Sequence, residues 1–285
     1  MPALASLLPC GTRLHLQHGP IDLVIGADGD REAGFAAAKA RFATVLDELV
    51  AELPLLKSQL VALSPTPKGG IAQAMDRATR PLCDHFVTPM AAVAGAVADT
   101  VLAAMQAVTP LQRIYVNNGG DIALHLAAGQ HFDTAMMDHQ GRDLGRIQLT
   151  HADRIGGIAT SGRHGRSLSM GIADSVTVLA SSAAQADAAA TLIANAVDLP
   201  GHTAIYRRAA NQVQSDSDLG DRLVVTHCEA LSTADIHTAL QAGAHQALDM
   251  QHSGHIIAAA LFLQGENRLI GRTGFTPTVR TQVNA

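Results

Sequence analysis

The amino-acid sequence predicts an α+β fold in which an antiparallel sheet is covered by helices. Hairpin patterns are mixed with long helical patterns, strands and helices do not alternate regularly, and no Gly-x-Gly-x-x-Gly motif is present. A doubly wound nucleotide-binding fold is therefore disfavoured. The 285 residues suit one domain with a core of aliphatic side chains, because 47% of the residues are hydrophobic and only 3% are aromatic.

The first part of the chain reads as one hairpin followed by three helices. The hairpin strands alternate polar and apolar residues around a Gly-Pro turn, and the helices repeat apolar residues at a spacing of three or four. The expected elements are strands at 13–18 and 21–26 and helices at 31–53, at 71–83 and from about residue 90. Asp28 or Asp30 is placed to cap the first helix, and Pro54 is placed to stop it.

The rest of the chain reads as further hairpins and two helices. The expected elements are strands at 113–116, 122–126, 158–160, 175–180 and 223–227, a hairpin around 139–142, and helices that begin at Ser182 and Ser232. Ser182 and Gln185 have the spacing of a capping box. Residues 255–264 fit either a helix or a strand, and the tail from Thr273 is expected to fray.

Composition disfavours several classes of protein. A net charge of −5 with few aromatic side chains argues against a nucleic-acid partner. Three cysteines without a Cys-x-x-Cys pair argue against a disulfide framework or zinc ribbon and fit a reducing compartment. The apolar run at 91–105 is shorter than the roughly 20 residues that span a bilayer. We therefore expect a buried helix there, no membrane partner and, since residues 1–10 lack an export signal, a cytoplasmic location.

A candidate metal site lies on the helix that begins at Ser182. Asp187 and Thr191 are four residues apart, so they share one helix face. A carboxylate and a hydroxyl are the hard oxygen ligands that Mg²⁺ prefers. Taken alone, Asp187 is better explained as an acidic residue in the first turns of a helix, which the helix dipole stabilises by about 0.3 to 1 kcal/mol.

Two glycine-rich segments offer backbone N–H groups to a ligand. Gly119 and Gly120 remove side-chain obstruction from the turn at 117–121. Residues 156–166 combine glycines, hydroxyls and two arginines, which suits an anion-binding nest for a pyrophosphate. A simple turn and a mobile surface loop explain the same segments.

Asp99 lies in the middle of an otherwise apolar helical segment. A carboxylate buried there without a partner would cost several kcal/mol, so Asp99 needs either a partner or a function. An internal hydrogen bond is the simpler explanation.

Five segments, taken in order, resemble those of the ApbE-like superfamily. They are residues 90–99, 116–122, 158–162, 174–178 and 186–191. The resemblance covers nearly the whole chain and is to a cytoplasmic branch of a superfamily whose known enzymes are Mg²⁺-dependent FAD:protein FMN transferases. It implies two duplicated T-fold-like halves within one domain of residues 1–285, with the boundary near residue 110.

The resemblance also implies site residues. Asp187 and Thr191 match the helix ligands of the family's Mg²⁺, and Ala91 falls where a backbone carbonyl contributes. The residues that match segments of the flavin nucleotide site are Asn118, Gly119, Gly120, Asp121, Thr160, Ser161 and Gly162, with Asp99 at the acidic end of a Lys-Gly-x-Ala-x-Asp motif. Arg163 or Arg166 would neutralise phosphate charge. The implied ligands are Mg²⁺ and FAD or FMN, and a homo-oligomer is compatible with the sequence.

The chain departs from the transferases at two places. Ala94 stands where they carry the motif lysine, and only residues 163–174 occupy the place of the segment His-Ile-x-Asp-Pro-x-Thr-Gly. Three functions stay open: Mg²⁺-dependent transfer or pyrophosphate cleavage of a flavin nucleotide, a non-catalytic module that binds a flavin or pterin-like ring, and a structural protein with a vestigial site. The absent lysine and the short loop favour the binding module.

Overall fold

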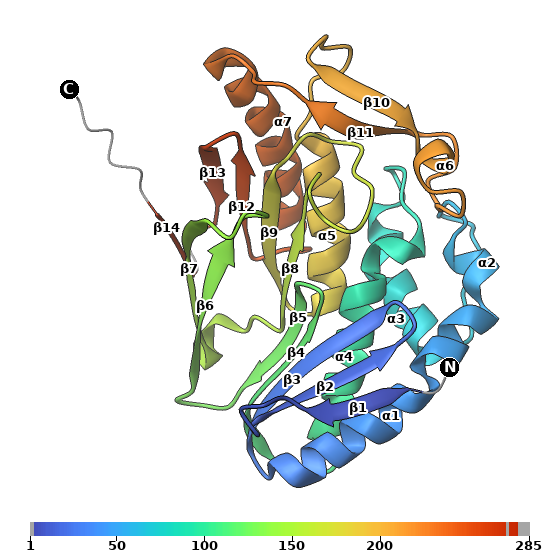
Figure 1. The fold of residues 1–285 in the computed structure, drawn as a ribbon, viewed down its shortest axis with the longest axis vertical. Coiled ribbons are helices and arrows are strands. Elements are labelled where there is room, and N and C mark those ends of the chain that lie inside the picture. Colours follow the sequence, from blue (N-terminus) through green and yellow to red (C-terminus); the bar gives the residue numbers. More distant parts are fainter. Residues whose placement is uncertain (1–2, 272–273, 279–285) are drawn as a thin grey trace.

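The computed structural model describes residues 3–271 and 274–278 and is built on a nine-stranded sheet in which all neighbouring strands are antiparallel (Figure 1). The strands are, in spatial order, β1 (Leu4–Leu7), β2 (Arg13–His18), β3 (Ile21–Gly29), β4 (Leu111–Asn118), β5 (Asp121–Leu126), β8 (Gly157–Ser161), β9 (Ser175–Ala180), β12 (Ala258–Leu263) and β13 (Glu266–Ile270). The predicted α+β class with an antiparallel sheet is confirmed.

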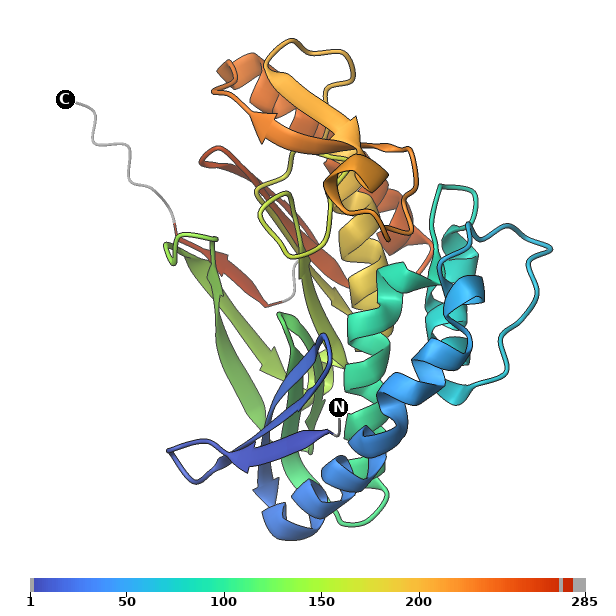
Figure 2. The ribbon, with the colours of Figure 1, turned by 45° about the vertical axis from the view of Figure 1, so that its right-hand side comes forward.

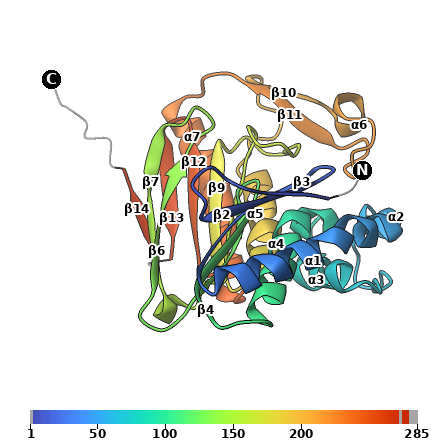
Figure 3. The ribbon, with the colours of Figure 1, turned by 60° about the horizontal axis from the view of Figure 1, so that its bottom comes forward.

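Helices α1, α3, α4, α5 and α7 cover one face of this sheet (Figure 3). The helices are α1 (Arg31–Ala51), α2 (Leu53–Leu56), α3 (Gly70–Thr79), α4 (Val93–Gln106), α5 (Ala183–Ala196), α6 (Ala210–Val213) and α7 (Thr233–His252), with 3₁₀ helices η1 (Arg80–Leu82), η2 (Pro89–Ala92) and η3 (His151–Asp153). A Cβ atom at Gly95 would lie 2.2 Å from the carbonyl oxygen of Ala183. Helices α4 and α5 therefore cross at a point where only glycine fits.

A three-stranded sheet covers part of the opposite face. It consists of β6 (His131–Met137), β7 (Asp143–Thr150) and β14 (Phe275–Pro277). Because side chains alternate along a strand, Val178 packs in the core beneath the helices while its neighbour Leu179 packs in a second core between the two sheets. Strands β10 (Ile205–Ala209) and β11 (Leu223–Cys228) form a separate hairpin next to α6.

The start of α1 follows the prediction, but its end does not. Asp30 caps the helix, since its Oδ1 accepts a hydrogen bond of 3.2 Å from the backbone N–H of Ala33. Helix α1 ends at Ala51, and Pro54 lies in the first turn of α2, where a missing N–H does no harm. Pro54 lies shortly after the C-cap Glu52, as expected of a proline that stops a helix, so only the predicted end of the helix at residue 53 is wrong.

Only half of the predicted capping box forms at the start of α5. The Ser182 hydroxyl accepts the backbone N–H of Gln185 at 3.3 Å. The side chain of Gln185 instead accepts a hydrogen bond from the Ser181 hydroxyl. The helix begins where the sequence predicts, with one of the two expected contacts.

Two uncertain segments near the C-terminus are strands. Within residues 255–264 the chain forms β12, which lies between β9 and β13 in the nine-stranded sheet and pairs with both. The expectation that the tail frays from Thr273 is wrong for β14, which pairs with β7. Thr273 itself and residues 279–285 lie outside the described residues.

One segment of the described chain is long and apolar enough to cross a membrane by length and composition. It is Pro89–Gln106, with a mean hydropathy of 1.3. Half of this segment is buried inside the protein, where α4 packs against α1, α5 and β4. Its apolar character is explained by that packing.

Candidate functional site

Helices α4 and α5 cap one another through two carboxylates. Asp187 of α5 accepts the backbone N–H of Gly95, at 3.0 Å, in the first turn of α4. Asp99 of α4 accepts the N–H groups of Ala183 and Ala184, at 3.0 and 2.9 Å, at the start of α5. Each carboxylate thus satisfies N–H groups that a helix leaves unpaired at its N-terminus.

Both oxygens of Asp99 are used in this contact, and burial raises the pKa of the carboxyl group. Asp99, which matches the family's flavin-site motif, is not among the lining residues of the cavities described below, and it fixes the start of α5 one turn before Asp187. This contact is the internal hydrogen bond expected from the residues alone.

The three residues expected to bind metal line one cavity. Asp187 and Thr191 from α5 and Ala91 from η2 all border a cavity of about 420 Å³, which we call the acidic cavity. Local helix geometry explains the pairing of Asp187 with Thr191, because residues four apart lie on one face. The tight crossing at Gly95 brings η2 to the same place.

Asp121 adds a carboxylate from the sheet to the acidic cavity, which Asp216 and Asp218 also line. It opens β5 directly after the turn, and its Oδ1 accepts the backbone N–H of Thr160 at 3.3 Å. Burial raises the pKa of Asp121 to about 7, against the opposing effects of the Thr160 hydrogen bond and the charge of Arg166. Burial, and then the negative charge of Asp121, raise the pKa of Asp187 well above its ordinary value, while the N–H groups of Gly95 and Ala94 oppose the rise. The pair therefore resists ionisation unless a cation lies beside it.

Arg166 lies over the two-glycine turn. Gly119 and Gly120 have φ angles of +68° and +115°, and a Cβ atom at Gly119 would lie 1.9 Å from Nη2 of Arg166. Asn118 anchors the turn, because its side-chain amide donates to the carbonyl of Ala94 at 3.1 Å. Glycine at 119 thus allows a guanidinium group to approach the backbone, at the border of the acidic cavity.

A second cavity, of about 380 Å³, lies on the other side of the same turn. We call it the ring cavity. Its polar lining comes from the turn, from the end of β8 and from the start of the loop that follows, and includes Gly119, Gly120, Thr160, Ser161 and Gly162. Its apolar lining comes from facing strands and includes Ile122, Met136, Met137, Ile147 and Ile158. Such a mixed lining suits a flat ring with polar edges.

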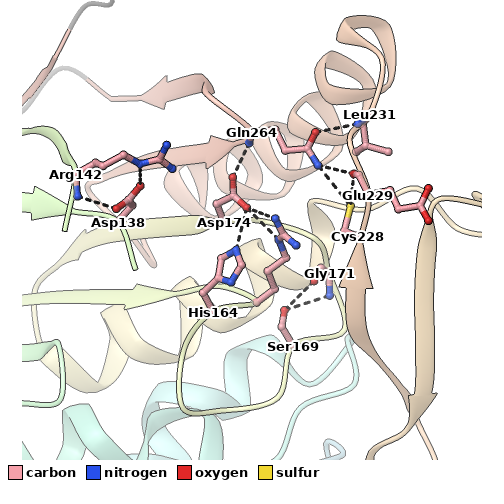
Figure 4. A network of polar contacts seen from close by, with 11 residues as sticks. Asp138, Arg142, His164, Ser169, Gly171, Asp174, Cys228, Glu229, Leu231 and Gln264 are labelled. Atoms are coloured by element: carbon pink, nitrogen blue, oxygen red, sulfur yellow. Dashed lines mark hydrogen bonds and ion pairs between the residues drawn. The ribbon is translucent and has the colours of Figure 1, made fainter. Parts of the chain in front are cut away.

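The loop after β8 is held by Asp174, at the centre of the network in Figure 4. Nε and Nη2 of Arg163 donate to Asp174 at 3.0 and 2.7 Å, and His164 lies 3.4 Å from the same carboxylate. The ring of His164 also stacks on His139 of the opposite hairpin, with ring centres 3.7 Å apart. The structure therefore engages Arg163 with a protein carboxylate and brings Arg166 to the acidic cavity.

The segment that follows α6 also lines the site, although no local pattern in the sequence indicates this. The segment after α6, residues 214–219, lines the acidic cavity from outside, and Figure 2 shows the β10–β11 hairpin over the upper ends of α4 and α5. Lys57 donates to the carbonyl of Asp216 at 2.5 Å, and Thr88 donates to Asp218. These contacts join segments more than one hundred residues apart, which no local pattern could indicate.

The donor set of the acidic cavity fits a hard divalent cation. Two carboxylates, a hydroxyl and a backbone carbonyl are oxygen ligands of the type that Mg²⁺ takes. A cation between Asp121 and Asp187 would also relieve the repulsion of two buried carboxylates. Among the described residues, no group of three or more His, Cys, Asp or Glu side chains could hold a metal ion, so a site of the zinc type finds no support.

Comparison with known proteins found relatives of two kinds. Residues 5–269 match the family model described as AbpE bacteria. The chain is 33% identical over 192 residues to the UPF0280 protein of Methanopyrus kandleri, an alignment that covers 66% of this chain and 75% of that protein. It is 40% identical over 119 residues to the UPF0280 protein of Methanocaldococcus jannaschii, which covers 39% of this chain and 45% of that protein.

A solved structure has a similar fold. The ApbE protein of Thermotoga maritima superimposes with a TM-score of 0.50 and 11% sequence identity, over 93% of this chain and 96% of that chain. At this identity the similarity concerns the fold alone.

Proposed function

Since the chain belongs to the AbpE bacteria family, whose model spans residues 5–269, we propose that it binds a flavin dinucleotide with Mg²⁺ and acts on the pyrophosphate. One observation carries this proposal. The ring cavity and the acidic cavity meet at one turn, where Gly120 borders the first and Asp121 borders the second. A dinucleotide such as FAD has the matching design, with a bulky group on each side of a central pyrophosphate.

The two cavities differ in chemistry, which orients the ligand. The isoalloxazine ring would lie in the ring cavity, between the apolar strands and residues 160–162 at the end of β8. The pyrophosphate would lie at the turn, where Gly119 and Gly120 leave the backbone open and Arg166 supplies a positive charge. Ala94 brings no charge to this place, and Lys57 at the outer rim is a second cation.

Asp187 and Thr191, with the carbonyl of Ala91 and the carboxylate of Asp121, would hold the Mg²⁺. When bound, the ion would neutralise pyrophosphate oxygens and stabilise charge that develops on them. The N–H group of Gly95 donates to one oxygen of Asp187 at 3.0 Å and so orients the carboxylate in the cavity.

The reaction would break the bond between the flavin-side phosphorus and the bridging oxygen. That oxygen and its electron pair leave with AMP, and a hydroxyl oxygen of the acceptor forms the new bond to phosphorus and loses its proton. With water as acceptor the products are FMN and AMP. Arg166 would stabilise the negative charge that grows on the leaving phosphate, so positioning and electrostatics would supply most of the rate.

A non-catalytic binding module is the second candidate. Ala94 in place of the lysine and the short loop held by Arg163 and Asp174 favour it. In that case the same two cavities would hold a flavin or a pterin-like ring without turnover.

Purified protein incubated with FAD and Mg²⁺ distinguishes the two candidates. Chromatography should detect AMP that appears only with Mg²⁺, and Asp187→Ala should abolish both AMP release and the rise in melting temperature caused by Mg²⁺. Asp47→Ala, which removes an exposed carboxylate on α1, is the matched control. A thermal shift with FAD but no AMP would support the binding module, whereas no shift with any flavin and Mg²⁺ would contradict both.

A further inference from the structure

A third cavity, of about 370 Å³, lies on the helix-free face of β2, β3 and β4. Three arginines line it, so we call it the arginine cavity: Arg13, Arg31 and Arg113, together with Thr12, Gly26, Ala27, Asp28, Tyr115 and Phe132. It shares no lining residue with the ring cavity or the acidic cavity. The function proposed above therefore makes no use of it.

Strand register builds one side of the arginine cavity. Arg13, Gly26 and Tyr115 are direct partners across three neighbouring strands, so they share a face. A Cβ atom at Gly26 would lie 2.4 Å from Cε1 of Tyr115. The Tyr115 ring thus occupies the space over the glycine, and its hydroxyl interacts electrostatically with Arg13.

The next row of the sheet supplies the other charges. Asp28 pairs in register with Arg113, whose Nε donates to the carboxylate at 2.6 Å. Arg31, at the start of α1, is anchored through Nε to the carbonyl of Ala27 at 2.9 Å. Its Nη2 forms an ion pair of 3.7 Å with Asp28, which is longer than a hydrogen bond, so this end of the anchored guanidinium group keeps donors for a ligand.

The cavity carries an excess of positive charge beside aromatic rings. Three guanidinium groups face one carboxylate and the thiol of Cys10, to which Nε of Arg13 donates at 3.4 Å. Hydrogen bonds from Arg13 and Thr12 lower the pKa of this thiol to about 6, so one positive charge remains in excess when both acidic groups are ionised. Phe132 lies edge-on to Tyr115, with ring centres 6.1 Å apart, and Arg113 lies 5.8 Å from the Phe132 ring centre. Guanidinium groups recognise phosphate and carboxylate, and aromatic side chains recognise flat rings.

We infer that the arginine cavity is a second binding site, for a small planar organic anion that carries a phosphate or carboxylate group on an aromatic ring. The anionic group would bind Arg13 and Arg31, and the ring would lie against Tyr115 and Phe132. The volume is within the range of small-molecule sites. The same face of β4 continues from Tyr115 to Asn117, which lines the ring cavity, so this ligand would lie beside the flavin site without entering it.

Phenyl phosphate is a suitable probe, with inorganic phosphate and benzyl alcohol as probes that lack the ring or the charge. The chain has two tyrosines and no tryptophan, so protein labelled with 3-fluorotyrosine gives two ¹⁹F signals, and Tyr206→Phe identifies that of Tyr115. Phenyl phosphate should shift the Tyr115 signal and saturate. It should bind at least about tenfold more tightly than either partial probe, measured by titration calorimetry.

Arg13→Gln and Arg31→Gln should each weaken phenyl phosphate binding about tenfold, since each removes a charge-assisted contact. Arg41→Gln is the matched control, because Arg41 pairs with Glu48 on α1 outside the cavity. No shift of the Tyr115 signal, equal affinity for inorganic phosphate, or equal affinity in the Arg13 and Arg31 variants would each overturn the inference. Asp187→Ala, which should abolish AMP release and the stabilisation by Mg²⁺, should leave phenyl phosphate binding unchanged, so the two proposals fail independently.

Discussion

Asp121→Asn should stabilise the metal-free protein at pH 8. The native fold holds the Asp121 carboxyl in a buried place where its pKa is raised to about 7 from 3.8. The native state therefore binds this proton more tightly than the unfolded state, and stability falls as the pH rises from about 4 to about 7. The asparagine side chain keeps the oxygen that accepts the Thr160 N–H and carries no charge.

The magnitude follows from that difference in pKa. A rise from 3.8 to about 7 corresponds to about 4 kcal/mol of destabilisation once the group is fully ionised. At pH 8 the variant should exceed the wild type by up to about 4 kcal/mol, or about 8 °C in melting temperature. At pH 5, where the carboxyl is mostly protonated in the native state, the difference should fall to about 2 kcal/mol.

Urea unfolding followed by circular dichroism, in EDTA at pH 5 and pH 8, measures both differences. Asp47→Asn on the exposed side of α1 controls for the change in net charge. Mg²⁺ at pH 8 should stabilise the wild type and have little effect on Asp121→Asn. A variant that is less stable than the wild type at pH 8, or a difference that does not change with pH, would refute the idea that Asp121 is buried without enough compensating charge.

Two further substitutions test the turn and the helix crossing. Gly119→Ala should weaken FAD binding about tenfold in titration calorimetry, because its Cβ would displace Arg166. Gly129 also has a positive φ, +81° against +68° at Gly119, but has open space around it, so Gly129→Ala should leave the affinity unchanged. Asp99→Ala should lower the free energy of unfolding by about 2 to 4 kcal/mol in urea, because two N–H groups at the start of α5 lose their acceptor. A loss below about 0.5 kcal/mol would show that water replaces the carboxylate at this helix end.

The local features of the fold were predictable from the sequence. Apolar periodicity located α1, and alternation located β2 and β3, because these patterns depend on neighbours three or two residues away. The same locality made the shared face of Asp187 and Thr191 predictable. Strand β1 was missed because its four residues are all exposed, so it has no buried face to give an alternating pattern.

Features that depend on distant segments were not predictable. The sequence left Arg163 and Arg166 as equal candidates for a phosphate, and the choice depends on Asp174, which β9 brings beside Arg163. The electrostatic interaction of Asp121 with Asp187, which line the same cavity, likewise depends on the crossing of α4 and α5 at Gly95. Neither relation produces a periodic pattern in the sequence, because each joins residues that are not separated by a fixed, short distance along the chain.

The reciprocal capping of α4 and α5 has a consequence for how relatives are compared. Asp187 caps the N-terminus of α4 in addition to its proposed role as a Mg²⁺ ligand, so selection for folding would preserve it in a protein that has lost its chemistry. Thr191 does not cap a helix, and Arg166 lies on a loop. In a survey of homologous genomes, the joint retention of these two side chains would be the better marker of a working enzyme, and the aspartate alone would be a marker of ancestry.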